Sequence, residues 1–504
     1  MQAAYALRNT HHTIRNTPMI DWLIDNAAFY FVQLSELLIF FYACMIFTAY
    51  IVTSFISNNA VMKYKELTEK LDFDGLLSSP LAPSISIVAP AYNETLSIVD
   101  NIRSLLSMRY ANFTLIVVND GSKDDTLQRG IDAYDLELID YEYDMKIDTK
   151  PVRGVYKSRN PAFGKLIFVD KVNGGKADAI NVGVNISDAD YFACIDVDCI
   201  LEPDAFLKLV RPIMMESEKR VVAVGGIVWL TNDSIIESGK IIQINAPKSF
   251  IARIQVVEYI RAFLLGRTAW TNANGLILIS GAMGLFERKL ALEIGGYNHK
   301  TVGEDFELVL RMHRVMRERK EPYQVAYAPE PLCWTEAPSS FNILSKQRNR
   351  WTRGSIDTLK LHKKLFFNPK YGLIGLLSYP YWFFAEWMAP LLEFFGMLFF
   401  LIISILGLVN WSFFLLLTVF VYAFSVFFST YALFTQELSY FKYESKKDIW
   451  KLFWTILLEP FYYHPRIVWW AVRGNYDFFI KKSHGWGEMV RTGFAQAPAA
   501  AKKP

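Results

Sequence analysis

The chain has 504 residues, of which 52% are hydrophobic and 15% aromatic, and a formal net charge of only +3 at pH 7. This length predicts two or more folding units. We expect no nucleic-acid partner, because no basic stripe with interleaved aromatic residues is present. The cysteines, Cys44, Cys194, Cys199 and Cys333, are scattered without a metal-like spacing. They predict reduced packing residues of a cytosolic domain.

Charged residues are nearly absent from two long stretches of the chain. Residues 28–57 contain one charged side chain, Glu36, and residues 372–435 contain only Glu386 and Glu393. About 20 apolar residues are enough to cross a bilayer as a helix. The charged sequence between the two stretches is typical of a soluble domain. The pattern therefore predicts a soluble domain bracketed by membrane anchors.

The polar segment 1–27 precedes the first apolar run. We expect 28–57 to be a transmembrane helix and no cleaved signal, because it is about 30 residues long and lacks a small-residue cleavage site. Basic residues give a slight bias for a cytoplasmic C-terminal side of this helix, through Lys63, Lys65 and Lys70.

Four apolar, β-prone runs follow in the order 85–88, 115–118, 165–169 and 191–195. Helical spacing over 94–108 separates the first two, and a helix opening at Gly175-Lys176 separates the last two. This βαβ pattern implies a mainly parallel sheet. Ligands of such sheets bind at the carboxyl ends of the strands.

Two carboxylates, Asp196 and Asp198, follow the fourth run at a spacing of i, i+2. On a strand this spacing points both side chains to one face. Hard oxygens of this kind suit Mg²⁺ or Mn²⁺ held against a diphosphate.

The segment from Asn173 to Asp178 contains Gly174-Gly175-Lys176 at the predicted start of a helix. Glycines at such a place leave backbone N–H groups open to an anion, and Lys176 adds positive charge. The alternative is a glycine-rich turn with a solvated lysine. It is not a Walker loop, because the Gly-Lys-Ser/Thr order is missing.

The segments that close the first two strands have two interpretations each. Residues 89–94 are either a turn with Asn93 as helix N-cap or a site where Tyr92 lies against a base, with Glu94 near it. Residues 119–122 have a composition typical of a turn, but Asp120 at a strand end can accept hydrogen bonds from a uracil or ribose. We favour function for Asp120.

Gly303-Glu304-Asp305 follows a second turn-rich stretch. A carboxylate beside a sugar acceptor can remove the hydroxyl proton as the oxygen attacks the anomeric carbon. Alternatively, these acidic residues cap a helix over 305–318, and both roles are compatible.

Residues 347–351 read Gln-Arg-Asn-Arg-Trp, just before the membrane-facing part of the chain. Arg350 can hold a pyrophosphate bidentately, and Trp351 offers a flat face to a sugar ring. The alternative is a basic juxtamembrane patch with Trp at the interface.

The C-terminal third predicts an interfacial amphipathic helix over 353–370, a transmembrane region of two to three spans over 371–472, and a basic tail over 473–504. Glu386 and Glu393 lie seven residues apart within the apolar run, so they share a helix face. We expect both to face the helix bundle beside a polymer exit route; the alternative is pairing with a basic residue such as Arg466.

Together these motifs resemble the inverting, membrane-embedded processive glycosyltransferases, over residues 84–352. That family includes the cellulose, chitin and hyaluronan synthases, the nodulation chito-oligosaccharide synthase and the poly-N-acetylglucosamine synthases; the last two are closest in layout. The resemblance implies an α/β nucleotide-diphospho-sugar transferase fold of the A type, in a cytosolic domain with flanking transmembrane helices.

The resemblance also implies roles for individual residues. Asp305 would be the catalytic base and Asp198 the metal ligand, with Mg²⁺ or Mn²⁺ as cofactor. The donor nucleotide and diphosphate would be bound by Ala89, Tyr92, Glu94, Asp120, Lys176, Asp178 and Asp196. The diphosphate and the acceptor end would be held by Glu304, Gln347, Arg350 and Trp351.

The implied function is processive transfer from UDP-N-acetylglucosamine or UDP-glucose to a growing β-linked polysaccharide, coupled to its export. One alternative is a single transfer to a lipid carrier; another is a membrane scaffold with an inactive transferase domain. The implied partners are the UDP-sugar, the glycan and membrane lipid, with room for accessory export subunits. The implied location is the bacterial inner membrane.

Overall fold

The computed structural model describes residues 18–69, 75, 79, 82–215, 218–237, 240–440 and 443–482. Most of the expected polar segment 1–27, up to residue 17, lies outside these ranges. The expected basic tail 473–504 is described only as far as residue 482.

The large sheet contains the strands that the sequence predicts. β1 (Ile85–Ala91) pairs in parallel with β2 (Phe113–Asn119) and with β6 (Tyr191–Ile195), and β2 pairs in parallel with β5 (Leu166–Lys171). Their side chains are buried almost without exception, as expected of strands covered on both faces.

β1 is the strand at which the order of the sheet switches sides. The strands β2 and β5 lie on one side of β1, and β6 lies on the other. A crevice for ligands forms at such a switch point, outside the carboxyl ends of the strands. The segments after β1 and β6 are therefore the first place to look for a site.

The other half of the sheet is mixed, which the sequence did not predict. Among the described residues the full order is β3-β4-β5-β2-β1-β6-β11-β8-β12-β7. β11 (Met283–Glu287) runs antiparallel to β6 and β8, whereas β8 (Arg220–Leu230) and β12 (Tyr323–Thr335) are parallel. The remaining strands are β3 (Leu136–Ile139), β4 (Val152–Ser158), β7 (Ile200–Leu201) and the separate hairpin β9 (Ile235–Glu237) and β10 (Lys240–Gln243).

Helices connect the strands of this domain. The helical spacing predicted for 94–108 and 175–184 corresponds to α4 (Ile98–Leu106) and α6 (Lys176–Ile186). α11 (Glu304–Arg319) starts at the acidic pair. The others are α5 (Thr126–Tyr134), α7 (Ala205–Met215), α8 (Phe250–Tyr259), α9 (Thr268–Asn272) and α10 (Arg288–Glu293), with a π-helical segment, η2 (Ile260–Arg267), between α8 and α9.

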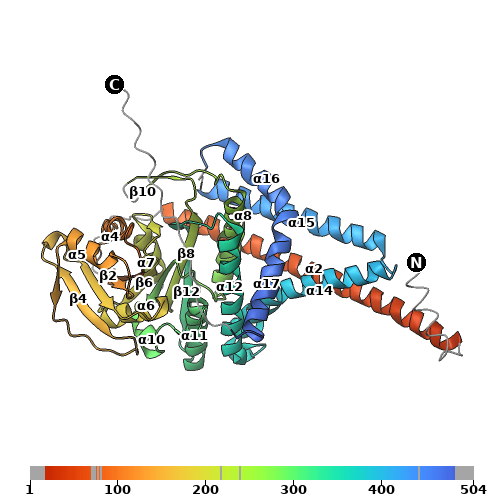
Figure 1. The fold of residues 1–504 in the computed structure, drawn as a ribbon, viewed down its shortest axis with the longest axis horizontal. Coiled ribbons are helices and arrows are strands. Elements are labelled where there is room, and N and C mark those ends of the chain that lie inside the picture. Colours follow the sequence, from red (N-terminus) through yellow and green to blue (C-terminus); the bar gives the residue numbers. More distant parts are fainter. Residues whose placement is uncertain are drawn as a thin grey trace, which may run out of the picture.

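Three helices are long and apolar enough to cross a membrane, over Phe29–Thr68, Ile374–Ile405 and Trp411–Tyr440. They belong to α2 (Pro18–Glu69), to the segment that ends in α14 (Ala389–Ile405), and to α15 (Trp411–Tyr440). All three run away from the sheet at one end of the molecule (Figure 1). Stacked rings join α2 to α15, with 3.8 Å between the ring centroids of Phe47 and Phe424.

The region between the sheet and these helices differs from the expected domain boundaries. The boundary at 352/353 falls within one helix, α12 (Phe341–Leu361). Leu359 and Leu365 are buried in a cluster with Phe306 of α11, so part of the expected interfacial segment 353–370 packs against this helix.

The expected transmembrane region 371–472 contains two of the three candidate spans. It continues into α16 (Lys446–Tyr462) and reaches into α17 (His464–Phe479). α17 lies beside α12 (Figure 1), where a Cβ added to Gly474 would come within 2.8 Å of the Thr352 side chain. The end of the chain's described part therefore packs along the domain.

Candidate active site

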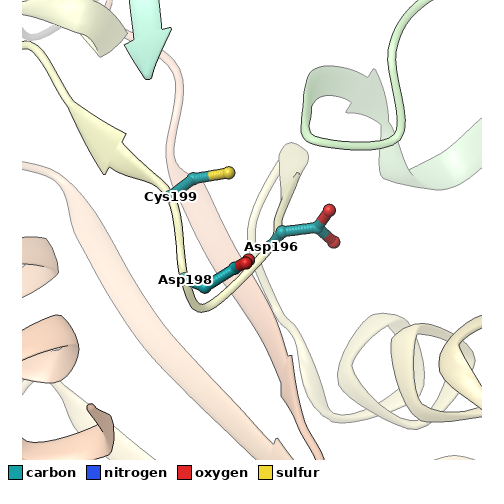
Figure 2. Close-up of side chains that lie close together, drawn as sticks. All are labelled: Asp196, Asp198 and Cys199. Atoms are coloured by element: carbon teal, nitrogen blue, oxygen red, sulfur yellow. The ribbon is translucent and has the colours of Figure 1, made fainter. Parts of the chain in front are cut away.

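Asp196 and Asp198 lie just beyond the carboxyl end of β6, next to the switch point. They lie in a turn, not on the strand, and the Cys199 N–H closes this turn by donating to the Asp196 carbonyl oxygen at 2.9 Å. One ligand atom each from Asp196, Asp198 and Cys199 lie within 4.8 Å of one another. Their side chains project to the same side of the turn (Figure 2).

The donor set of this turn suits a hard cation. Both carboxylates are partly exposed, whereas Cys199 is buried. A hydrogen bond with Cys333, together with burial, holds the pKa of the Cys199 thiol well above its usual range. A neutral thiol is a poor metal ligand, so the carboxylate oxygens are the groups that could hold Mg²⁺ or Mn²⁺.

Lys176 lies directly beside this turn. Its ammonium forms an ion pair with Asp196 and donates to the Gly281 carbonyl oxygen at 2.9 Å. Burial lowers the pKa of Lys176, but Asp196 and Glu304 outweigh that effect, and the net shift is upward. The lysine therefore stays charged at the mouth of the site.

Glu304 and Asp305 start α11 opposite Lys176. Burial raises the pKa of Glu304 to about 8, with the neighbouring Asp305 acting in the same direction and Lys176 against it. Asp305 is less buried; its Oδ2 accepts the Gly281 N–H and its Oδ1 accepts its neighbour's N–H, both at 2.8 Å. The two carboxyls thus have different environments, and the helix begins at residue 304, with Gly303 as N-cap.

The glycine loop before α6 is not open to an anion in the way that the sequence predicted. The N–H groups of Gly174 and Gly175 donate to the two carboxylate oxygens of Asp120, at 2.9 and 2.8 Å. The loop amides therefore already bind an anion, which is a side chain of the same chain.

A buried lysine, Lys171, completes this arrangement at the end of β5. Its ammonium lies 2.6 Å from Asp120 and 2.6 Å from Asp178. The sequence predicted both aspartates as donor-binding residues. Asp178 also accepts the Lys150 N–H at 3.1 Å, so in this structure it binds to the chain itself.

The loop after β1 carries the other predicted donor residues. Ala89 is buried within β1, whereas Tyr92 is 44% exposed. Glu94 accepts the Ser97 hydroxyl at 2.6 Å. The alternative for Asn93 as N-cap is wrong, because Ser97 occupies that position. Asn93 instead accepts the Lys123 N–H at 2.9 Å and so ties the loops after β1 and β2 together.

A cavity of about 680 Å³ opens between α11, α12 and the sheet edge. Of the predicted residues, those that line it are Lys176, Asp196, Glu304, Asp305, Gln347, Arg350 and Trp351. Ala89, Tyr92, Glu94, Asp120, Asp178 and Asp198 are not among its lining residues. The tertiary structure therefore joins the end of β6, the acidic pair and the Gln-x-x-Arg-Trp group in one space.

The Gln-x-x-Arg-Trp group lies on one helix, α12. Burial lowers the pKa of the Arg350 guanidinium, and the carboxylates of Glu304 and Asp196 oppose that shift. Trp351 is 40% exposed, and the Arg348 guanidinium lies over its ring, 4.3 Å from the centroid. Arg348 in turn forms a bidentate ion pair with Glu258, so the indole rests on a fixed cation.

The cavity extends toward the apolar helices, where Trp382, Glu386 and Trp387 line it. Glu393 does not line it; it pairs with His464 at 2.6 Å, which matches the alternative of pairing with a basic residue, although His464 and not Arg466 is the partner. Glu386 therefore lies at the part of the cavity that is next to the candidate spans.

Sequence reasoning missed Lys171, Gly281, Arg348 and the position of Cys199. Lys171 had one local signal, since it ends a fully buried strand immediately before the glycine loop. Gly281 had none; a Cβ there would lie 3.1 Å from Asp305 Oδ2 and 3.4 Å from Lys176 Nζ. Such close approaches depend on the tertiary structure.

Two family models match the chain. Residues 86–166 match "Glycosyl transferase family 2", and residues 191–428 match "Glycosyl transferase family group 2". The first runs from β1 to the start of β5, and the second runs from β6 through α12 into α15. The two matched regions therefore form a family 2 glycosyltransferase with a GT-A-like sheet, which confirms the resemblance seen in the sequence.

Curated relatives of the same kind cover about half of the chain. Poly-beta-1,6-N-acetyl-D-glucosamine synthases from Staphylococcus epidermidis and Staphylococcus aureus are 27% and 28% identical, over 276 and 278 residues. In each case the match spans 55% of this chain and 55% of the relative.

Solved structures give looser matches. A mannosyltransferase from Pyrobaculum calidifontis, in complex with GDP-Man and Mn²⁺, is 13% identical with a TM-score of 0.48, over 88% of this chain and 99% of that one. Glucosyl-3-phosphoglycerate synthase from Mycobacterium tuberculosis, with Mn²⁺, UDP and phosphoglyceric acid, is 17% identical with a TM-score of 0.34, over 60% and 83%.

Proposed function

We propose that this family 2 glycosyltransferase transfers sugar units processively from a UDP-sugar to the end of a growing β-linked polysaccharide, with inversion at the anomeric carbon. The observation that carries the proposal is the single cavity shared by Lys176 and Asp196, by Glu304 and Asp305, and by the Gln-x-x-Arg-Trp group on α12. Relatives named poly-beta-1,6-N-acetyl-D-glucosamine synthases favour UDP-N-acetylglucosamine over UDP-glucose as donor.

The donor end lies at the switch point between β1 and β6. Lys176 and Arg350 bring positive charge to the position of the leaving diphosphate. Asp198, beside Asp196, would hold Mg²⁺ or Mn²⁺, which when bound offsets the charge that develops on the leaving UDP.

The acceptor end lies between α11 and α12. Asp305 removes the proton of the attacking hydroxyl as it adds to the anomeric carbon. The carboxyl of Glu304 has a pKa raised to about 8, so it is mostly protonated at neutral pH and can donate a hydrogen bond to an acceptor oxygen. Trp351 supplies a flat face on which the terminal sugar stacks.

Repeated transfer requires that the product stay bound while it moves by one unit. Stacking on Trp351 does not depend on one particular hydroxyl, so the chain end can slip without full release. Glu386 and the tryptophans at the far end of the cavity lie on the way to the apolar helices. We propose that the glycan is exported along this route. The catalytic domain would then lie on the cytosolic face of a bacterial inner membrane, and accessory export subunits would be further partners.

The first experiment measures UDP release by the purified protein with a panel of UDP-sugars and Mn²⁺ or Mg²⁺, followed by mass spectrometry of the products. We expect long glycans from one donor of the panel. Single-sugar products on a lipid would favour the alternative of one transfer to a carrier. No UDP release with any donor would overturn the proposal.

The second experiment compares the product lengths of Trp351→Ala with those of wild type, together with the donor KM of both. We expect shorter products and a donor KM within about threefold, because the indole faces the acceptor end. An unchanged length distribution from a folded Trp351→Ala protein would rule out the stacking role.

A further inference from the structure

A fully buried lysine lies behind the donor end of the site. The side chain of Lys171 is 0% exposed, and its ammonium makes three contacts of 2.6 Å, with Asp120 Oδ1, Asp178 Oδ1 and the Val172 carbonyl oxygen. A lysine ammonium has three N–H donors, so each contact uses one. Both carboxylates are almost completely buried as well, with side chains 5% and 7% exposed.

This cluster continues into the glycine loop. Asp120 Oδ1 also accepts the Gly174 N–H, and its Oδ2 accepts the Gly175 N–H. Gly175 has φ +88°, which only glycine adopts without strain, and the next residue is Lys176 at the first turn of α6. Lys171 is therefore linked to the backbone next to Lys176 through two contacts, its own ion pair with Asp120 and the hydrogen bond from the Gly175 N–H to Asp120.

We infer that Lys171 is a positioning residue of the donor site. It fixes the Asp120 carboxylate, and through this carboxylate it fixes the Gly174-Gly175 turn that directs Lys176 toward Asp196. This inference rests on the proposed function, since the ligand is the nucleoside diphosphate part of the donor.

Asp120 keeps one acceptor position for this ligand. A carboxylate has about four lone-pair positions. Among the hydrogen bonds of the described residues, two use Oδ1 and one uses Oδ2. The remaining position on Oδ2 can accept one N–H or O–H of the donor's base or ribose, in a direction that Lys171 sets from the other oxygen.

The test must separate positioning from stability, because Lys171→Met alone leaves two buried carboxylates without their cation. The double variant Lys171→Met/Asp178→Asn removes one positive and one negative charge, so the charge of the cluster stays the same. A single lysine control is Lys165→Met; Lys165 is exposed and donates only to the Ala111 carbonyl oxygen among the hydrogen bonds of the described residues.

The experiment measures UDP affinity by calorimetry at saturating Mn²⁺, and donor and acceptor KM with kcat. For the double variant we expect about tenfold weaker UDP binding and a donor KM raised by a similar factor, with acceptor KM unchanged. Lys165→Met should match wild type. Lys171→Arg should not rescue, because the larger guanidinium has no space in a fully buried position.

Several outcomes would overturn the inference. These are wild-type UDP affinity in the double variant, a loss that falls on acceptor KM, or a wild-type protein that binds no nucleoside diphosphate. If wild type binds UDP but transfers no sugar, the proposed function fails, while the comparison of UDP affinities still decides the role of Lys171.

Discussion

Glu304 and Asp305 are neighbours in the sequence, but burial gives them different chemistry. The side chain of Glu304 is buried at the wall of the cavity, and this burial raises its pKa to about 8. Asp305 is held at the cavity by the Gly281 N–H, which leaves it the better candidate for proton removal. Two adjacent carboxyls can therefore serve as hydrogen-bond donor and as base.

Asp305→Asn should lose at least about 10²-fold in kcat, because an amide cannot take the proton of the attacking hydroxyl. UDP binding should be retained, since the role proposed for Asp305 concerns the acceptor and not the nucleotide. Steady-state kinetics and UDP titration of the same sample measure both. Turnover near that of wild type would contradict the role as base.

The raised pKa of Glu304 predicts a pH dependence of stability. The folded state binds the proton more tightly than the unfolded state, whose carboxyl has the ordinary pKa near 4.5. The resulting stabilisation is complete below this lower value and is lost as the pH rises through about 8. The full effect is on the order of a few kcal/mol, because each pKa unit corresponds to about 1.4 kcal/mol.

Glu304→Gln cannot ionise, so its thermal unfolding midpoint should fall less than that of wild type between pH 5 and pH 9. Melting curves of both proteins across this range, in the same detergent, give the comparison. Parallel pH profiles for the two proteins would show that Glu304 is not the group that carries the effect.

Metal dependence is also a prediction about single residues. EDTA should abolish UDP release, and added Mn²⁺ or Mg²⁺ should restore it, because the oxygens of Asp198 and Asp196 suit hard cations. Asp198→Ala should not be restored by either ion. Full activity in EDTA would exclude a metal requirement.

At the scale of elements, α12 approaches the start of α11 closely beside the cavity. Gly354 on α12 lies against Gly303, the N-cap of α11; a Cβ on Gly354 would come 2.8 Å from the Gly303 Cα. Backbone therefore meets backbone, and the helix that carries Arg350 and Trp351 lies close to Glu304.

Gly354→Ala should separate the two helices. Overpacking of this kind typically costs about 1–3 kcal/mol, which exceeds the gain in helix propensity of up to about 1 kcal/mol. We expect a lower melting temperature and a lower kcat. Gly396→Ala is the matched control, because a Cβ on this helical glycine meets nothing within 4 Å. Equal melting temperatures for the two variants would contradict the close contact.

At the scale of the whole molecule, α2 is fastened to the sheet by a polar cluster. Tyr64 near the end of α2 donates to Glu330 of β12 at 2.7 Å, and Lys208 of α7 pairs with Glu330 at 2.9 Å. The Arg211 guanidinium lies 4.6 Å from the centroid of the Tyr64 ring. These contacts join the first candidate span to the catalytic domain.

Glu330→Gln removes a charge that two elements share, so we expect a loss of stability on the order of 2 kcal/mol, since Lys208 remains partly buried. Tyr64→Phe removes only the hydrogen bond and should cost about 1 kcal/mol. Thermal unfolding of both variants in detergent shows which variant loses more stability. A larger loss for Tyr64→Phe than for Glu330→Gln would contradict the central place of Glu330.

The sequence by itself determined the parts that depend on local order. The apolar runs 85–88, 115–118, 165–169 and 191–195 alternate with helical spacing, and this fixes the parallel half of the sheet and puts Asp120 and Asp196 at one edge. The stretches without charge likewise mark the three candidate spans. Periodicity and composition are properties of neighbouring residues, so they can be read directly.

Only the tertiary structure decided the pairings between distant segments. The place of β11 between β6 and β8, the contact of Gly303 with Gly354, and the ion pair of Asp120 with Lys171 all join residues that lie about 50 or more positions apart. The glycine loop illustrates the reason. The sequence predicted that its amides are open to an anion, but a carboxylate more than fifty residues away accepts their hydrogen bonds. N–H groups that are partly shielded from water need acceptors, and only the fold decides which acceptors are near.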